Sequence, residues 1–362
     1  MKNYLKNIPF FSNLLRRIYH DIIIKYSLSE LVFSKAPLRR RFNYLKVKYS
    51  AVKGLKRSLG SPILLTIEPT NICNLKCPIC ETGAGILNRA KKNMTLEEFK
   101  HVLDQFDDNL EQLFFYFMGE PFLNKDAYDM IQYASDKGIY VTSCTNGEQV
   151  EPEKLVNSGI GEIDFQISGM TQDVHEIYRI GANLERTFQN LEETIKIRNF
   201  SFSRKHKMAI VAGFILMKHN EHQVDNFIKY CQSIGVDKYN IIGTCLRDVN
   251  QGEVFLPSDR SYWYYDEEEY KQGNLVPKIR PDNYCGWIYS TATILVNGDV
   301  VACCRDPKGE YFIGNVFKER FSDIWNNQKY RAIRYRVSTN SNNMKLCRLC
   351  SGEGIPRLIE KM

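Results

Sequence analysis

Three closely spaced cysteines are the strongest chemical signal in this 362-residue sequence. Cys73, Cys77 and Cys80 form a C-x3-C-x2-C pattern shortly after the apolar run at residues 63–67. Three thiolates on one short loop can each bind one iron of a 4Fe-4S cube, which leaves the fourth iron open to a substrate or cofactor. A structural zinc ion needs four ligands that close a tetrahedron. The spacing therefore favours an open iron-sulfur cluster over zinc.

Composition and cysteine usage support an intracellular redox or metal protein. The chain has eleven cysteines, and its early apolar stretch around Phe10 is interrupted by Arg16 and Arg17, so it lacks the pattern of a secretion signal. A disulfide framework is therefore not expected, and the protein is expected in the cytoplasm. Hydrophobic residues make up 43% and charged residues 25%, as in globular proteins. No apolar run approaches the roughly 18 residues that a membrane span needs.

The positive charge is concentrated at the N-terminus. Residues 1–60 carry a net charge of +12, whereas the remainder of the chain carries −5. Apolar residues recur at spacings of three and four through residues 8–33, beside Arg16, Arg17 and Lys25, which predicts a basic amphipathic helix. Such an extension suits peripheral binding to a membrane, and packing on the protein's own body is an equal alternative. A nucleic-acid partner is not expected, because no aromatic-interleaved platform accompanies the charge.

From residue 61 onward, β-rich apolar runs alternate with helical segments. Repeats of this kind predict parallel strands whose working loops lie at the carboxyl ends of the strands. Thr95 and Glu98 have capping-box spacing, and Gly138 stands where a helix C-terminus is expected. Six units predict an α/β partial (β/α)6 barrel. The expected strands are 63–68, 113–117, 139–143, 162–168, 208–215 and 238–242, and the expected helices are 95–106, 126–137, 151–157, 184–198 and 221–234.

The cysteine loop resembles that of the radical S-adenosylmethionine (SAM) superfamily. Ile79 departs from the family pattern, which usually has an aromatic residue before the last cysteine. After the second strand, Met118 precedes Gly119, Glu120 and Pro121, a segment similar to the family's GGEP motif with Met in place of the first glycine. The resemblance implies that the backbone and Glu120 hold the methionine amino group of SAM.

Further family motifs follow the next two expected strands. Asn146 stands in a Thr-Asn-Gly segment after the third strand. Ser168 ends the fourth strand and Arg179 follows shortly after, similar to the family segment whose Ser and Arg contact the ribose and carboxylate of SAM. Each motif alone is weak, but four in register across residues 61–245 indicate a radical SAM core. The implied cofactors are SAM and a 4Fe-4S cluster.

The C-terminal region resembles the SPASM and shorter twitch extensions of radical SAM enzymes, which bind auxiliary clusters. An Asn-Gly turn at residues 297–298 predicts a hairpin that leads into Cys303 and Cys304, and a helix containing residues 324–326 is expected after it. Cys285, Cys347, Cys350 and one of the adjacent pair can close a second 4Fe-4S cluster. The twitch pattern favours Cys303, with Cys304 as the alternative. A structural zinc site on these residues is also open.

The complete domain prediction has four parts. Residues 1–60 form the helical extension, 61–245 the radical SAM core, 246–284 a linker and 285–362 the auxiliary cluster domain. The resemblance implies that an electron from a low-potential donor, such as flavodoxin or ferredoxin, enters the SAM cluster. A 5′-deoxyadenosyl radical then removes a hydrogen atom from the substrate. Four cysteines remain, and they are expected in the core: Cys144, Cys231, Cys245 and whichever of Cys303 and Cys304 does not bind the auxiliary cluster.

The substrate is the least determined part of the prediction. An auxiliary cluster that accepts an electron makes the net reaction an oxidation, as in radical SAM dehydrogenases that convert an alcohol to a ketone. With the basic extension, this favours a small molecule such as a sugar, a cyclitol or a lipid-linked saccharide. Arg247, His219 and Tyr239 are weak candidates for the catalytic base. The alternatives are a SPASM-type peptide or protein maturase and a non-enzymatic iron-sulfur electron carrier.

Overall fold

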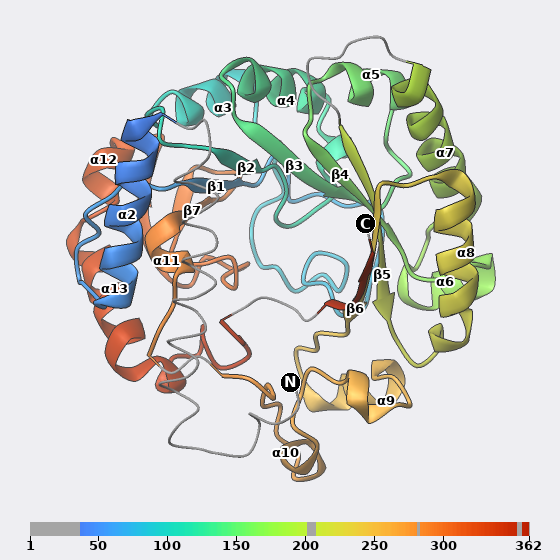
Figure 1. Cartoon of the computed structure of the whole chain (residues 1–362). Helices are drawn as coiled ribbons and strands as arrows, with labels where there is room; N and C mark the ends of the chain where they lie inside the picture. Colours follow the sequence, from blue (N-terminus) through green and yellow to red (C-terminus); the bar gives the residue numbers. More distant parts are fainter. Residues whose placement is uncertain (1–36, 201–207, 281–282, 353–356, 362) are drawn as a thin grey trace.

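The computed structural model describes residues 37–200, 208–280, 283–352 and 357–361. Within these residues, one ten-stranded sheet curves into an open barrel that is covered on its outside by helices (Figure 1). The strand order is β10-β6-β5-β4-β3-β2-β1-β7-β8-β9. The predicted partial barrel is confirmed, and it forms the β1 to β6 part of this sheet. These strands are β1 (Leu64–Ile67), β2 (Gln112–Phe114), β3 (Tyr140–Thr145), β4 (Glu162–Ile167), β5 (Ala209–Leu216) and β6 (Lys238–Gly243).

All six predicted strands are present and pair in parallel with their sequence neighbours. Strand β2 is shorter than predicted and ends at Phe114, five residues before the chain turns at Gly119, whose φ is +85°. The hydrophobic core lies between the sheet and the outer helices and includes Phe99, Ile163 and Phe227, all fully buried. Because β1 to β6 are parallel, their carboxyl ends lie at one end of the barrel, and every loop that follows one of these strands opens there.

The helices between the strands pack on the outer face of the sheet (Figure 1). The capping box is confirmed: the Thr95 hydroxyl accepts from the Glu98 N–H at 3.1 Å, and the Glu98 carboxylate accepts from the Thr95 N–H at 2.9 Å. Gly138 has φ +74° just beyond the end of α4, as a helix C-terminus requires. Helix α6 was not predicted. The outer helices are α3 (Leu96–Leu103), α4 (Ala127–Asp136), α5 (Pro152–Asn157), α6 (Gln172–Tyr178), α7 (Leu184–Phe200) and α8 (Val224–Ile234).

The C-terminal region extends the barrel sheet. Strand β7 (Thr291–Ile294) pairs in parallel with β1 and antiparallel with β8 (Asp299–Val301), which confirms the hairpin. Strand β9 (Phe312–Asn315) completes this end of the sheet. The helix expected around residues 324–326 ends earlier, since α12 spans Phe321–Ile324 and the longer α13 (Gln328–Asn340) follows. Between β6 and β7 lie short helices: α9 (Gly252–Phe255), α10 (Glu267–Lys271) and α11 (Trp287–Ser290).

The other end of the sheet is formed by β10 (Arg357–Lys361), which no sequence pattern predicted. It pairs antiparallel with β6, so a residue such as Lys361 lies opposite Tyr239. This pairing satisfies backbone groups that β6 would otherwise present at an open edge.

The described part of the N-terminal extension is helix α2 (Leu38–Val52), which packs against the barrel beside α11. The amphipathic helix predicted at residues 8–33 lies outside the described residues. Among the described residues, no helix is both long and apolar enough to cross a membrane.

A buried ion pair joins the start of the barrel to the C-terminal region. Glu68, fully buried after β1, accepts two hydrogen bonds from the Arg89 guanidinium, at 2.6 and 2.7 Å. It also accepts from the Val296 N–H at 2.9 Å, just past β7, while Arg89 donates to the Pro307 carbonyl at 2.8 Å. Burial raises the pKa of Glu68, and Arg89 acts in the opposite direction by favouring the carboxylate.

Replacing Arg89 by Met should destabilise the protein by about 3 to 5 kcal/mol, because it leaves the Glu68 charge buried without its partner. Denaturant unfolding of the reconstituted protein measures the loss. Lys92→Met is the matched control: it removes the more exposed Lys92–Glu98 pair and should cost about 0 to 1 kcal/mol. Adding Glu68→Gln to Arg89→Met should recover part of the loss. Equal costs for the two single variants would contradict the role given to the buried pair.

Candidate active site

The three cysteines of the predicted open cluster lie on the loop after β1, which crosses the mouth of the barrel (Figure 1). The Cys73 sulfur accepts from the Leu75 N–H at 3.4 Å, and the Cys80 N–H donates to the Cys77 carbonyl at 3.2 Å. The pKa of Cys73 is raised to about 12, mainly by burial and also by negative charge on Glu120, Cys77 and Cys80. The three thiols are therefore electrostatic neighbours.

This loop has the donors for an open 4Fe-4S cluster. No three Cys, His, Asp or Glu side chains in the described residues are close enough to hold a single metal ion. A cube does not require that closeness, because each of its cysteines binds a different iron. All eleven cysteines are free thiols. Binding iron would convert these buried thiols to thiolates, which removes the cost of charging them alone.

Two glycines let the backbone pack tightly around the cluster loop. A Cβ on Gly83 would lie 2.4 Å from the Cys77 nitrogen, and a Cβ on Gly119 would lie 2.7 Å from the carbonyl oxygens of Thr70 and Ile72. The next residue, Glu120, donates its N–H to the Ile72 carbonyl at 2.8 Å. The predicted GGEP-like segment is thus fixed directly against the loop that carries the cysteines.

The Glu120 carboxylate is buried behind this loop. It accepts from the Thr145 hydroxyl at 2.7 Å and from the Asn146 N–H at 2.9 Å. Burial raises the pKa of Glu120 to about 7, against these hydrogen bonds and the positive charge of Arg179. A buried carboxylate with few neutralising partners suits a cationic ligand group, such as the amino group of SAM. Pro121, the last residue of the motif, begins a short 3-10 helix, Pro121–Leu123.

Ser168 and Arg179 form the opposite part of the same site. The Arg179 Nε donates to the Ser168 hydroxyl at 2.9 Å, and both side chains are buried. Against the effect of burial, the positive charge of Arg179 lowers the pKa of both Cys77 and Glu120, so Arg179 lies near both the cysteine loop and the carboxylate. The structure therefore brings together the predicted SAM-binding residues Gly119, Glu120, Pro121, Asn146, Ser168 and Arg179 beside the cysteine triad.

A hydrogen-bonded chain of polar residues, not predicted from the sequence, orients this group. The Asn146 amide donates to the Asn74 side chain at 2.9 Å, and the Asn74 amide donates to Glu148 at 2.9 Å. The Glu148 carboxylate also accepts from the Asn183 N–H at 2.8 Å. Asn74 lies inside the cysteine motif, and Glu148 directly follows the Thr-Asn-Gly segment. Their positions in or beside these motifs were the sequence signal that could have identified them.

The C-terminal cysteines also gather into one group. The pKa of Cys285 is raised to about 12, mainly by burial and also by negative charge on Cys303, Cys347 and Cys350. Burial likewise raises the pKa of Cys347 to about 12, with Cys303 and Cys350 as charged neighbours. Cys303 packs against the main core, whereas Cys304 is exposed, so the expectation that a spare Cys304 lies in the core is wrong. These four residues can hold a second 4Fe-4S cluster, with all its irons bound by protein.

One apolar region joins the two cysteine groups. Leu75, Cys77 and Ile79 of the SAM loop pack in a cluster that Leu349 also contacts, and Leu349 stands between Cys347 and Cys350. The Tyr264 hydroxyl donates to the Leu349 carbonyl at 3.2 Å. Cys245, predicted to be a spare core residue, lies here and accepts from Arg305 at 3.4 Å.

The weak catalytic candidates differ in position. Arg247, just past β6, donates to the Pro78 carbonyl inside the cysteine motif. His219, after β5, packs against Phe255, and burial lowers its pKa. Tyr239 lies near the start of β6 against Phe227, so the structure does not bring it to the end of the barrel where the loops meet.

The barrel interior holds polar residues that the sequence analysis did not select. Burial raises the pKa of Tyr116, and negative charge on Cys144, Asp164 and Cys304 acts in the same direction, so these groups face one another. Phe114 stacks on Trp287, two residues after Cys285, with ring centroids 6.0 Å apart. Alternate positions on β3 and β4 point inwards, and this alternation was the signal that could have found Cys144 and Asp164.

Replacing Gly119 by Ala should reduce the iron bound at the SAM site and destabilise the protein by about 2 to 3 kcal/mol, because the new Cβ would combine positive-φ strain with a backbone clash. Iron analysis and thermal unfolding measure both effects. Gly138→Ala is the control, since Gly138 also has positive φ but nothing within 4 Å of its Cβ position. It should cost about 1 kcal/mol and leave the iron content unchanged. Full iron content in Gly119→Ala would show that the close packing of Gly119 against the cysteine loop is not needed to hold the cluster.

His175 should make the protein less stable in mild acid. It is fully buried, its Nδ1 accepts from the Ser168 N–H, and burial lowers its pKa from 6.5 to about 3. Between these values the unfolded chain binds a proton that the folded protein does not, so stability falls as pH drops below about 6.5. From pH 7 to pH 5, this group lowers the free energy of unfolding by about 2 kcal/mol. Denaturant unfolding should show a shallower pH dependence for His175→Asn; an identical slope would exclude His175 as its source.

Comparisons with known proteins find two family domains in this chain. Residues 67–231 match the radical SAM superfamily, and residues 285–351 match an iron-sulfur cluster-binding domain, SPASM. An AdoMet-dependent heme synthase of Methanosarcina barkeri is 24% identical, over 76% of this chain and 85% of that protein. The mycofactocin maturase MftC of Mycolicibacterium smegmatis is 23% identical, over 78% and 75%. The structure of Streptococcus suis SuiB bound to SAM has a similar fold, with 16% identity, coverage of 94% and 84%, and a TM-score of 0.59.

Proposed function

The chain belongs to the radical SAM superfamily and carries a C-terminal SPASM domain, and from this we propose that it oxidises a polypeptide substrate. It is an enzyme that uses SAM and 4Fe-4S clusters. Together, SAM and the clusters supply a 5′-deoxyadenosyl radical, which takes a hydrogen atom from the substrate, and a second site that accepts an electron. The chain's own residues bind SAM, fix its orientation and exclude water.

One observation carries the proposal of a net oxidation. The group of Cys285, Cys303, Cys347 and Cys350, all partly buried, contacts, through Leu349, the apolar cluster around the SAM loop. A closed auxiliary cluster held there cannot bind substrate without losing a ligand, but it can take an electron from a substrate radical. With both groups bound, the net change would be an oxidation in which the substrate gives up a hydrogen atom, an electron and a proton, and the auxiliary cluster held by these cysteines would supply the electron acceptor. A low-potential donor such as flavodoxin or ferredoxin would supply the electron that starts each turnover.

Some residues of this chain would bind SAM, and others would position the cysteine loop or the substrate. Glu120 would accept from the amino group of SAM, while Ser168 and Arg179 would contact its ribose and carboxylate. Arg247 contacts the cysteine loop through the Pro78 carbonyl, which suits a positioning residue more than a base. The interior group of Tyr116, Cys144 and Asp164 would face the substrate.

The named relatives favour a polypeptide substrate over the saccharide that the sequence favoured. The mycofactocin maturase aligns over three quarters of both chains, and a PqqA peptide cyclase of Bradyrhizobium diazoefficiens aligns at 22% identity over about half of each. The heme synthase shows that relatives of similar identity also act on other compounds. The choice of substrate therefore needs a direct test.

Protease treatment distinguishes the two substrate classes. Reconstituted enzyme, SAM and dithionite are incubated with cell extract from the source organism, separated into peptide, protein and small-molecule fractions, and substrate-dependent 5′-deoxyadenosine is measured. We expect stimulation by a peptide or protein fraction, lost after that fraction is digested with protease. Stimulation confined to the small-molecule fraction and resistant to protease would overturn the polypeptide proposal and restore the saccharide. No 5′-deoxyadenosine under any condition would instead support the electron-carrier alternative.

Loss of the auxiliary site should separate SAM cleavage from product formation. The double variant Cys347→Ala and Cys350→Ala should still form 5′-deoxyadenosine but lower the yield of oxidised product by at least about 100-fold, because the substrate radical loses its electron acceptor. Cys304→Ala is the control and should keep both the iron content and the product. Full product from the double variant would exclude the electron-acceptor role, and iron loss in Cys304→Ala would assign the ligand to Cys304.

A further inference from the structure

Helix α2 has an apolar face that no described residue covers. Its exposed large residues recur at spacings of four and three, which place them along one side of the helix. The opposite side is held on the body by buried residues that include Asn43 and Val47. The exposed stripe consists of Leu38, Phe42, Leu45, Tyr49 and Val52, with exposed fractions of 68, 62, 44, 54 and 51%.

Basic residues border this stripe on both sides. Residues 38–57 contain eight Lys or Arg and no Asp or Glu. At about 100° per residue, Arg41 and Lys48 lie along one margin of the stripe, and Arg39, Lys46 and Lys53 along the other. An apolar stripe between two rows of cations is the arrangement of helices that lie in the plane of an anionic membrane surface.

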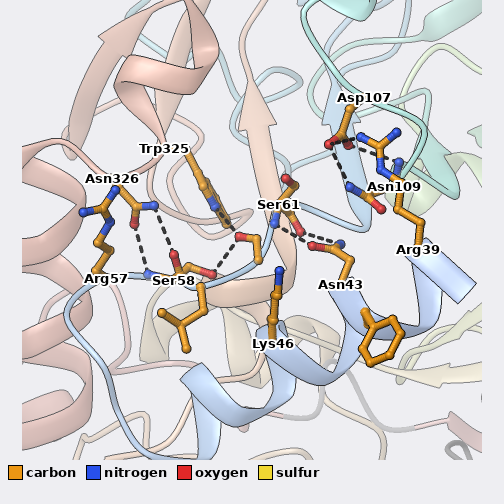
Figure 2. Close-up of a pocket in the computed structure, with 13 residues that line it drawn as sticks. Arg39, Asn43, Lys46, Arg57, Ser58, Ser61, Asp107, Asn109, Trp325 and Asn326 are labelled. Atoms are coloured by element: carbon orange, nitrogen blue, oxygen red, sulfur yellow. Dashed lines mark hydrogen bonds and ion pairs between the residues drawn. The ribbon is translucent and has the colours of Figure 1, made fainter.

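A basic pocket adjoins the same helix. It has a volume of about 860 Å³ and lies between α2, residues 57–61 and the C-terminal region (Figure 2). Arg39 on its wall is paired with Asp107 at 3.1 Å and Asp108 at 3.4 Å. Lys46 and Arg57 also line it, and neither forms an ion pair with any described residue. Two cations without carboxylate partners, beside the side chains of Ser61 and Asn43, suit an anionic oxygen ligand.

Helix α2 is fixed firmly enough to orient the enzyme. The Asn43 amide donates to the Ser61 carbonyl at 3.0 Å, and the Ser61 N–H donates back to the Asn43 side chain at 2.8 Å. The Ser50 hydroxyl accepts from the Leu59 N–H at 3.0 Å. These bonds attach the helix to the segment that forms the pocket wall, so the stripe and the pocket move together.

We propose that the α2 stripe and the adjoining pocket form a docking surface for an anionic phospholipid membrane. The stripe enters the boundary between headgroups and acyl chains, the flanking cations remain among the headgroups, and Lys46 and Arg57 bind a lipid phosphate. Charge complementarity selects this occupant: a second copy would oppose like charges, and residues 1–36 themselves carry a net charge of +4.

Vesicle sedimentation of the full-length protein tests the docking surface. The protein should partition onto phosphatidylcholine vesicles that contain phosphatidylglycerol, and weakly onto phosphatidylcholine alone. Changing Phe42→Ser and Val52→Ser should reduce partition by about 10-fold, because two membrane-inserted side chains are lost. The matched control is Phe200→Ser with Val254→Ser, which removes a Phe and a Val exposed elsewhere, by 73% and 55%. It should partition like the parent.

A second double variant tests the contribution of the pocket to membrane binding. Lys46→Gln with Arg57→Gln should reduce partition by about 10-fold or more on anionic vesicles, because each cation near the surface contributes to binding. It should have no effect on neutral vesicles. Unchanged circular dichroism and 5′-deoxyadenosine formation would show that each variant is folded.

Three results would overturn the proposal. Absence of parent binding to anionic vesicles would exclude the surface altogether, and a concentration-dependent dimer lost in Phe42→Ser with Val52→Ser would then identify a second copy as the occupant. Equal partition of that variant and the parent would assign membrane binding to residues outside α2. Equal loss in the Phe200→Ser and Val254→Ser control would show an unspecific effect of removing exposed apolar side chains.

Discussion

The bidentate bond between Glu68 and Arg89 is the contact on which the two halves of the molecule depend. Glu68 leaves β1 at the point where the cysteine loop begins, and the same carboxylate accepts from Val296 beyond β7. Arg89, at the far end of that loop, reaches the Pro307 carbonyl in the C-terminal region. A charge pair with almost no solvent exposure tolerates little displacement, because any separation leaves a buried ion unpaired. The loop of the first cluster and the domain of the second are therefore held in one arrangement.

The barrel could be predicted because its signals are local. Each strand from β1 to β6 is a short apolar run bounded by turn residues, and the Thr95 capping box and Gly138 mark helix ends by side-chain and backbone chemistry that depends on few neighbours. The pairing of β1 with β7 and of β6 with β10 could not be predicted in the same way. These contacts join segments more than a hundred residues apart, and neither strand has a pattern that specifies its partner.

The residues of the site also differ in how far the sequence could predict them. The residues of the SAM motifs follow successive strands, and parallel strands deliver such residues to one end of a barrel, so their gathering followed from topology once the motifs were identified. The polar chain through Asn74 and Glu148 and the interior group around Tyr116 depend on side-chain directions, which spacing does not reveal. Tyr239 illustrates the reverse case: it stands on the right strand but near its beginning, whereas the working loops lie at its end.

The pairing of β1 with β7 also has a consequence for the order of synthesis. Strand β1 is completed early, but its neighbour on one side, Thr291–Ile294, emerges more than two hundred residues later. Until then, β1 has an unsatisfied edge, and Glu68 lacks the Val296 N–H that helps to neutralise it. A nascent chain would thus present the three cysteines of the first motif on a loop that lacks its tie to the C-terminal region. Iron loading before residue 296 has been translated would therefore meet a cysteine loop whose first residues are not yet held by the C-terminal region.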